Sequence, residues 1–279
     1  MTDLHTSIGP ADCPSADGMP MLGLGTWQNT DPDQCAESVR TALELGYRHV
    51  DTAQAYDNEA AVGDGIAAAD VDREELFLAT KVWYSNLAGE DVRRTTRASL
   101  ERLGVDAVDL LYVHWPAGPY DPEDTLSAFA DLHDEGLIDR IGVSNFTPEL
   151  LEEALEGCDA PIVANQVELH PLFPQEELRA VCDRHDVTVV AYSPLARGRV
   201  FDVPEIREVA AKHDASEAQV SLVWLREQGV VAIPKATSRE HLADNWASLE
   251  LELDAEDVAA IDAIDRTSRE VDPRFAPWN

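Results

Sequence analysis

Lysine is the scarcest charged residue of this chain. The 279 residues include three lysines, and 54 acidic residues outnumber 21 basic ones, which gives a formal net charge of −33. A field of this sign repels nucleic acid and anionic membrane surfaces, so both are excluded as partners. Because the acids are spread along the chain, we interpret them as the solvated surface of a salt-adapted protein. A docking surface for a cationic partner is the alternative.

Cysteine is also scarce, and long hydrophobic runs are absent. The four cysteines lie far apart and match neither zinc nor redox spacing. Scattered thiols are typical of a reduced compartment. No apolar stretch approaches membrane-spanning length, and residues 1–5 lack the basic and apolar regions of a secretory signal. We therefore expect a cytoplasmic protein that does not enter a membrane.

What the chain does have is a regular alternation of short apolar runs and longer amphipathic segments. Strands are predicted at 21–23, 49–51, 76–80, 108–113, 139–143, 162–166, 188–191 and 231–233. Helices are predicted at 33–45, 58–69, 89–103, 122–135, 148–156, 174–185, 216–228 and 238–249, with two extra helices at 203–213 and 255–265.

Eight strand-and-helix units in about 250 residues predict a single α/β domain with the (β/α)8, or TIM barrel, fold. An open doubly wound sheet is the alternative, but the glycines at 23 and 25 are not followed by a third, and no helix is predicted to open there. Residues 1–20 are expected to form an irregular segment or a hairpin, and residues 267–279 a short C-terminal tail.

Lys81 is the most informative residue, because it closes a buried strand in a chain that has nearly eliminated lysine. A buried ammonium needs a partner. In a parallel barrel, side chains at the carboxyl ends of strands meet on one face. Asp51 ends the preceding strand, with Tyr56 just beyond it, and His114 ends the following one. Taken singly, Tyr56 could be an ordinary loop tyrosine and His114 a core histidine. Lys81 and Asp51 could form a purely structural ion pair.

The strings around these residues are more specific than any one of them. They are GYRHVDTAQAYDNE (46–59), LATK (78–81), LLYVHWP (110–116), IGVSNF (141–146), NQVELHP (165–171), AYSPLARG (191–198) and IPKATSREHLADN (233–245). In this order and spacing the chain resembles the aldo-keto reductase superfamily over about residues 18–272, most closely its microbial members with short loops. The resemblance implies a TIM barrel oxidoreductase that reduces aldehydes and ketones.

The resemblance implies that Tyr56 is the proton donor, that Lys81 and Asp51 tune it, and that His114 orients the carbonyl. Physical chemistry agrees on the groups needed. A phenol has an ordinary pKa near 10, and an ammonium about 4 Å away contributes on the order of 4 kcal/mol, enough to lower that pKa by up to about three units before desolvation takes some of this back. Asp51 would keep Lys81 charged, and the three groups would titrate together.

No side chain supplies a hydride, so a nicotinamide cofactor is implied. By resemblance, Ser144, Asn145 and Gln166 hold its carboxamide and Tyr192 stacks on its ring, although such residues are more often strand-end caps or core. The resemblance also assigns to the cofactor site Gly25, Thr26, and Ser193 and Leu195 in a loop that closes over the pyrophosphate.

The adenosine end departs from the family pattern. Lys235 is present, but Ala236 and His241 replace the serine and arginine that usually help to hold a 2′-phosphate. Arg239 lies nearby, and Asp244 and Asn245 match adenine contacts. A bidentate arginine binds phosphate better than a neutral imidazole. NADPH is favoured because the chain has kept these cations, and NADH remains possible; Arg239 is alternatively a plain surface residue.

Three tryptophans, Trp27, Trp83 and Trp115, follow strand-end motifs and are expected to form the substrate pocket, or else ordinary rim packing. Trp278 is expected either to fold over the pocket or to be exposed. The short loops resemble those of members that act on small aldehydes, dicarbonyls and sugar-derived ketones.

The expected partner is therefore a small carbonyl compound, and the expected form is a monomer. A dehydrogenase acting in the oxidative direction and a non-catalytic cofactor-binding regulatory subunit are the alternatives. A metal-dependent hydrolase is disfavoured, because no ligand set is apparent and we expect no metal.

Overall fold

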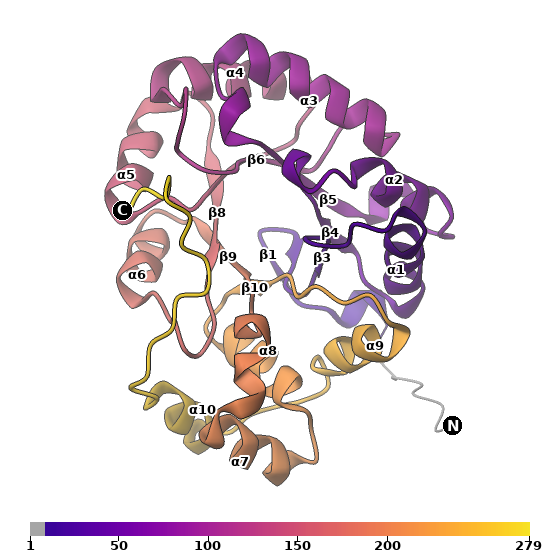
Figure 1. Ribbon diagram of the computed structural model, residues 1–279, viewed down its shortest axis with the longest axis vertical. Coiled ribbons are helices and arrows are strands. Elements are labelled where there is room, and N and C mark those ends of the chain that lie inside the picture. Colours follow the sequence, from indigo (N-terminus) through magenta and orange to yellow (C-terminus); the bar gives the residue numbers. More distant parts are fainter. Residues whose placement is uncertain (1–8) are drawn as a thin grey trace.

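The computed structural model describes residues 9–279, and its centre is a ring of eight parallel strands (Figure 1). Each strand pairs with the one that follows it in the chain. The strands are β3 (Leu24–Gly25), β4 (His49–Asp51), β5 (Phe77–Val82), β6 (Leu110–Val113), β7 (Ile141–Ser144), β8 (Ile162–Glu168), β9 (Thr188–Tyr192) and β10 (Val231–Ala232).

Hydrogen bonds between the first and last strands close the sheet into a barrel. Gly23 N donates to Ala232 O at 2.9 Å, and Gly25 N donates to Pro234 O at 3.1 Å. A side chain at Gly25 would place its Cβ 2.5 Å from the carbonyl oxygen of Ile233, so this seam requires glycine. The predicted (β/α)8 fold is confirmed, with eight parallel strands inside a ring of helices.

The helices surround the barrel (Figure 1). They are α1 (Pro32–Leu45), α2 (Glu59–Ala67), α3 (Gly89–Leu103), α4 (Pro122–Asp134), α5 (Pro148–Gly157), α6 (Glu176–Arg184), α7 (Pro204–His213), α8 (Glu217–Glu227), α9 (Arg239–Ala247) and α10 (Ala255–Asp262). The two extra helices predicted from the sequence are α7 and α10. No helix among residues 9–279 is long and apolar enough to cross a membrane.

Local chemistry explains where a helix such as α1 begins and ends. The Asp31 carboxylate accepts from Gln34 N at 2.9 Å, and Pro32 occupies the first helical position. The helix ends at Gly46, which has φ 120°. Its inner face buries Val39 and Leu43 completely, so an amphipathic stripe fixes the helix to the barrel.

The first strand differs from its predicted position. We expected it at 21–23, but β3 is Leu24–Gly25, and Leu22 forms only an isolated bridge to Ala232. The chain changes partner here, since Leu22 pairs with the last strand and Leu24 pairs with Val50 of β4. The apolar run was visible in the sequence, whereas this switch of partner was not.

A hairpin of β1 (Ser15–Ala16) and β2 (Met19–Pro20) precedes the barrel. Met19 is buried against Phe77, Tyr112 and Val231, which belong to the barrel interior. The hairpin therefore fills the end of the barrel opposite the carboxyl ends of the strands. Residues 1–8, which begin the segment expected to be irregular or a hairpin, lie outside the described residues.

The residues after α10 form neither helix nor strand. They leave α10 and run past α6 towards α5 (Figure 1). Phe275 packs against Tyr84 and Trp115, with ring centroids 4.5 and 5.4 Å apart. The tail therefore lies over the carboxyl ends of the strands.

Candidate active site

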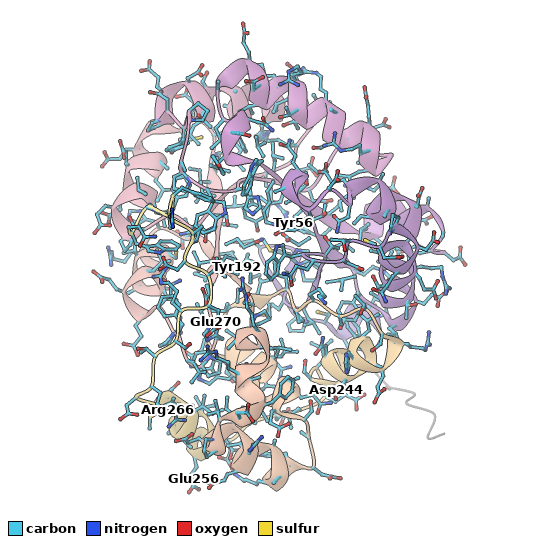
Figure 2. The ribbon with its side chains drawn as sticks, in the orientation of Figure 1. Tyr56, Tyr192, Asp244, Glu256, Arg266 and Glu270 are labelled. Atoms are coloured by element: carbon cyan, nitrogen blue, oxygen red, sulfur yellow. The ribbon has the colours of Figure 1, made fainter. Side chains whose placement is uncertain are left out.

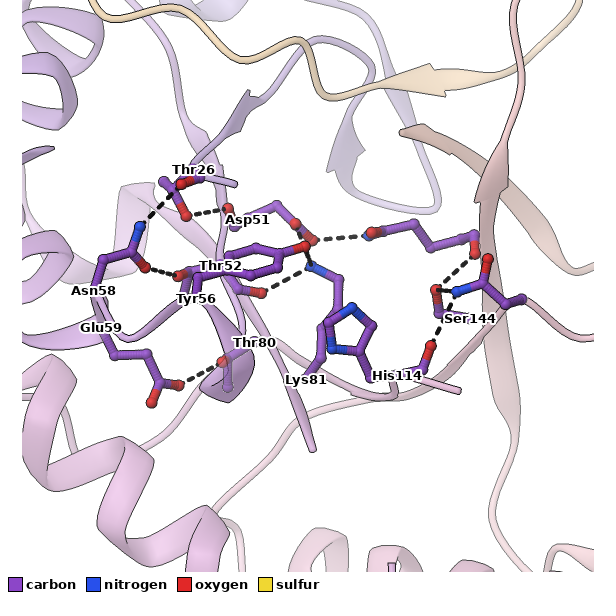
Figure 3. Close-up of polar contacts among 12 residues, drawn as sticks. Thr26, Asp51, Thr52, Tyr56, Asn58, Glu59, Thr80, Lys81, His114 and Ser144 are labelled. Carbon is purple, nitrogen blue, oxygen red and sulfur yellow. Dashed lines mark hydrogen bonds and ion pairs between the residues drawn. The ribbon is translucent and has the colours of Figure 1, made fainter. Parts of the chain in front are cut away.

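The four predicted catalytic residues lie together at the carboxyl ends of three adjacent strands (Figure 3). Asp51 ends β4, Lys81 lies in β5, and His114 directly follows β6. Tyr56 is the last residue of the 3-10 helix η2 (Gln54–Tyr56), which begins three residues after β4. Parallel pairing of these strands brings side chains from separate sequence motifs into one cluster.

Lys81 and Asp51 form a buried ion pair at the centre of this cluster. The Lys81 ammonium contacts Asp51 Oδ1 and donates to Thr52 O at 2.8 Å. Gln166 Nε2 donates to the other carboxylate oxygen of Asp51 at 2.8 Å. Burial lowers the pKa of Lys81, and the negative charge of Asp51 opposes that shift. Each buried charge thus has a partner, as its desolvation requires.

Tyr56 lies beside this ion pair, with its hydroxyl 3.4 Å from Lys81 Nζ. Burial raises the pKa of Tyr56 well above its ordinary value of 10.0, and the charge of Asp51 raises it further. Burial was expected to offset part of the lowering by Lys81, and it outweighs that lowering. The reason is that Asp51 compensates the ammonium charge and that burial disfavours a phenolate.

His114 is held edge-on to Tyr56, with the ring centroids 5.7 Å apart. Burial lowers the pKa of His114 well below 6.5, and the charge of Lys81 adds to the effect. Its Nδ1 has no hydrogen-bond partner among the described residues. A neutral imidazole has one N–H group, so His114 can donate a single hydrogen bond to an oxygen that reaches Tyr56.

Four polar side chains continue the cluster along β7, β8 and β9. Ser144 Oγ donates to Gln166 O at 2.8 Å, and Asn145 Nδ2 donates to His114 O at 3.0 Å. Tyr192 OH donates to Asn145 Oδ1 at 2.7 Å. Asn145 has φ 63°, a left-handed conformation that asparagine tolerates. The network fixes the side chains predicted to hold a carboxamide.

A cavity of about 910 Å³ opens above these residues. It brings together fourteen of the predicted site residues: Gly25, Thr26, Trp27, Asp51, Tyr56, Trp83, His114, Trp115, Asn145, Gln166, Tyr192, Ser193, Leu195 and Lys235. Lys81 and Ser144 lie beneath its surface, with exposed fractions of 0% and 1%. Aromatic rings and hydrogen-bonding groups dominate the lining, as in sites for small organic ligands.

Four predicted residues of the adenosine end, Arg239, His241, Asp244 and Asn245, lie away from this cavity. Arg239 is exposed, with Nη1 3.7 Å from Glu44 Oε2. The carboxylate of Asp244 accepts from Ser216 Oγ at 2.7 Å and from Gln219 Nε2 at 2.8 Å, which connects α9 to α8. Asn245 is buried and His241 is exposed.

A loop after β9 crosses one side of the cavity. Within the 3-10 segment η5 (Ala196–Asp202), Arg197 and Gly198 have φ 50° and 96°. The Arg197 guanidinium lies 4.6 Å from the centre of the Trp27 ring. Arg199 Nε lies 2.9 Å from Glu270 Oε1 of the C-terminal tail. The loop thus contacts both the first strand-end loop and the tail.

The C-terminal tail was expected to influence substrate choice, but Trp278 was its only residue named for the pocket, and other tail residues line the cavity. Glu270, Asp272 and Phe275 line the cavity, as do Tyr56 and Tyr192, which Figure 2 labels together with Glu270. The aromatic cluster of the tail was the available signal. Trp278, expected to fold over the pocket or to be exposed, is partly buried against Trp115 and lines a separate, smaller cavity.

Among residues 9–279, no group of three or more histidine, cysteine, aspartate or glutamate side chains is arranged to hold a metal ion. The charged groups at the centre of the site are the paired side chains of Lys81 and Asp51. The Tyr56 hydroxyl lies between the Lys81 ammonium and the His114 ring.

The aldo/keto reductase family model matches residues 21–266. The chain belongs to this family. It is 43% identical over 267 residues to methylglyoxal reductase DkgB of Escherichia coli O157:H7, covering 94% of this chain and 99% of that one. It is 40% identical over 251 residues to glyoxal reductase of Bacillus subtilis (strain 168), covering 90% and 91%.

Solved structures of the family have the same fold. An aldo-keto reductase from a Medee basin deep-sea metagenome library superposes with a TM-score of 0.88 at 34% identity, covering 92% of this chain and 95% of that one. An aldo/keto reductase from Brucella melitensis gives 0.83 at 38%, covering 88% and 94%. The protein is thus an oxidoreductase that acts on carbonyl compounds, in a family that generally uses nicotinamide cofactors.

Proposed function

We propose that this aldo/keto reductase reduces small uncharged aldehydes and 2-oxoaldehydes with NADPH, and that Tyr56 donates the proton. The observation that carries the proposal is the position of the Tyr56 hydroxyl, 3.4 Å from Lys81 Nζ and beside His114 at the floor of an aromatic cavity. A proton donor, a charge to stabilise its conjugate base and an oxygen-binding imidazole are the groups that carbonyl reduction needs.

A bound reduced nicotinamide supplies the hydride. The N–H of His114 orients the carbonyl oxygen and stabilises its developing negative charge. Tyr56 gives its proton to that oxygen, and the Lys81 ammonium stabilises the phenolate that remains. Asp51 keeps Lys81 charged and directed towards the hydroxyl. Burial raises the pKa of Tyr56, so the phenol holds the proton that reduction requires.

The residues of the cavity fit a nicotinamide cofactor. Asn145 and Gln166 present amide groups to the cavity, which suits a carboxamide, and the Tyr192 ring offers a stacking surface beside them. The loop with Arg197 and the exposed Lys235 provide cations for phosphates at the other end. Ser144 supports this group from beneath, and Gly25 and Thr26 form the wall next to Lys235.

The substrate side of the cavity favours compact, neutral carbonyls. Trp27, Trp83 and Phe275 provide its apolar surface, and Glu270 and Asp272 are the carboxylates of its tail side. Carboxylates in the wall of a pocket disfavour a substrate that carries a carboxylate of its own. The names of the relatives, methylglyoxal reductase and glyoxal reductase, point to the same class of compound.

The test is oxidation of NADPH and NADH, followed in parallel by absorbance, with methylglyoxal, glyoxal, glyceraldehyde and aromatic aldehydes. A matched pair, 4-carboxybenzaldehyde and its neutral methyl ester, tests the preference for uncharged substrates. We expect the ester to have a kcat/KM about tenfold higher, since like charges repel across the pocket. No turnover of any carbonyl, with cofactor binding seen by fluorescence quenching, would favour a regulatory subunit. Turnover of alcohols alone would favour a dehydrogenase.

We also propose that the protein is cytoplasmic, salt-adapted and monomeric. The four cysteines are free, which supports a reduced cytoplasmic location. The net charge of −33 supports salt adaptation and a monomer, because acidic surfaces repel each other. We also propose that residues 1–279 form one domain around the barrel. Size-exclusion chromatography with light scattering tests the oligomeric state.

A further inference from the structure

Glu168 is a buried carboxylate at the carboxyl end of β8, with an exposed fraction of 2%. It does not line the large cavity. A buried carboxylate is costly unless it is hydrogen-bonded or paired with a cation. Its partners therefore indicate what the residue is for.

Two of those partners are backbone N–H groups of the C-terminal tail. Glu270 N donates to Glu168 Oε1 at 2.6 Å, and Val271 N donates to Glu168 Oε2 at 2.8 Å. His170 Nε2 lies 3.0 Å from Oε1. Both carboxylate oxygens are thus engaged by the tail, and hydrogen bonds to a charged acceptor are stronger than those between neutral groups.

The tail has no helix or strand of its own, so it is held by side-chain contacts, which include these hydrogen bonds and the packing of Phe275 and Trp278 against Trp115. Five of its residues, Glu270, Val271, Asp272, Pro273 and Phe275, line the cavity. Nearby attachments are the Arg199–Glu270 ion pair and a hydrogen bond from Ser268 N to Leu172 O at 2.8 Å. Arg199 is exposed, so its ion pair is weak.

Strand β8 carries both Glu168, which binds the tail, and Gln166, which binds Asp51 beside Lys81 and Tyr56. Gln166 and Glu168 are two residues apart in β8, so both side chains project from the same face of the strand. Gln166 holds Asp51, and Glu168 holds the tail. A rigid strand therefore sets the distance between the wall of the substrate pocket and the groups that react.

We propose that Glu168 is a positioning residue that fixes the C-terminal tail as a wall of the substrate pocket through its two amide hydrogen bonds. The inference deepens the proposed function, and only its kinetic consequence rests on that function. When the attachment is lost, the tail leaves the barrel more often while the proton donor and its partners stay in place.

The substitution Glu168→Gln tests this, because the amide of glutamine has one acceptor oxygen and leaves one tail N–H without a partner. Trypsin cuts after Arg269 and Arg274, which flank the attached segment and are exposed. We expect cleavage at these two sites, followed by mass spectrometry, to accelerate about tenfold or more, since local opening exposes the chain. The KM for the carbonyl should rise about tenfold, with kcat and cofactor affinity changed less than about threefold.

Glu59→Gln is the matched control. Glu59 is equally buried, accepts from Thr80 Oγ1 at 2.6 Å and from Arg102 Nε at 2.9 Å, and has no hydrogen bond to the tail. Its substitution should leave cleavage at Arg269 and Arg274 unchanged. Equal acceleration in both variants would mean general destabilisation and would overturn the proposal, as would unchanged cleavage in Glu168→Gln.

A measurement on the unsubstituted protein keeps the proposal testable if the variant does not fold. The amide hydrogens of Glu270 and Val271 should exchange with solvent about a hundredfold more slowly than those of an open chain. Exchange at the open-chain rate would overturn the proposal. Neither proteolysis nor exchange requires turnover, so absence of reductase activity would contradict the proposed function and leave this inference standing.

Discussion

The two ends of the proposed cofactor site are built in opposite ways. At the inner end, Asp51, Lys81 and Gln166 are buried, and each hydrogen-bonds to another part of the barrel. At the outer end, Arg239 and His241 are exposed, and Arg239 forms a surface ion pair with Glu44 at 3.7 Å. The comparison indicates that the barrel holds the inner groups firmly, whereas the proposed cofactor preference would depend on a few surface side chains that solvent can screen.

Removal of the proton donor should have the largest effect on the inner end. We expect Tyr56→Phe to lower kcat for carbonyl reduction by about a thousandfold, since general acid catalysis contributes about 10²–10⁴. The NADPH dissociation constant, measured by fluorescence quenching, should change less than about twofold. Reductase activity close to that of the unsubstituted enzyme would show that another group supplies the proton.

The buried ion pair gives the next largest effect. Lys81→Met leaves the Asp51 carboxylate without a counter-ion and should lower the free energy of unfolding by about 3 kcal/mol. Adding Asp51→Asn should restore part of that loss, measured by urea denaturation, while kcat stays low. If the loss of unfolding free energy in the double variant equals the sum of the losses in the two single variants, the pair is not coupled.

The pH dependence of the two reaction rates tests the shifted pKa values of Tyr56 and His114 at the inner end. The proton-donating form of Tyr56 is populated below its pKa, which burial raises, and the pKa of His114 is lowered so that its ring stays neutral. The rate of reduction should therefore be flat between about pH 6 and 9, whereas alcohol oxidation should rise about tenfold per pH unit. A fall in the reduction rate centred near neutral pH would contradict these directions.

At the outer end, His241→Arg should tighten NADPH binding by about tenfold and leave NADH binding unchanged, because a guanidinium binds a 2′-phosphate in a bidentate manner. Arg239→Ala should weaken NADPH binding severalfold. Both constants can be obtained by fluorescence titration with the two cofactors. If NADH affinity changes to the same extent, these residues do not contact the 2′-phosphate.

Screening by salt should have the smallest effect. The net charge of −33 implies that acidic side chains repel one another across the surface. Because salt screens this repulsion, the melting temperature should rise by a few degrees between about 0.1 and 2 M KCl. The inner ion pair is shielded from solvent, so kcat should change little over this range. Maximal thermal stability in dilute buffer would contradict salt adaptation.

The sequence predicted the barrel because strands and helices alternated eight times, and it predicted the inner cluster because four motif residues followed strand ends. It did not predict that the pKa of Tyr56 is raised, since that depends on how fully Asp51 compensates Lys81 and on burial, which is a property of packing. Nor did it place Glu168 against Glu270, because these residues are 102 positions apart. The string NQVELHP shows an acid at the end of a buried strand, and only the fold shows what it holds.

The seam between β3 and β10 has a consequence for folding. These are the shortest strands of the barrel, with two residues each, and their hydrogen bonds join positions about 210 residues apart in the chain. Such distant contacts form late and open early, because closing the intervening loop is entropically costly. Gly25 and Lys235 form a bridge across this seam and also line the cavity. A ligand that bound both sides of the seam would favour the closed barrel over the open one and so raise its stability.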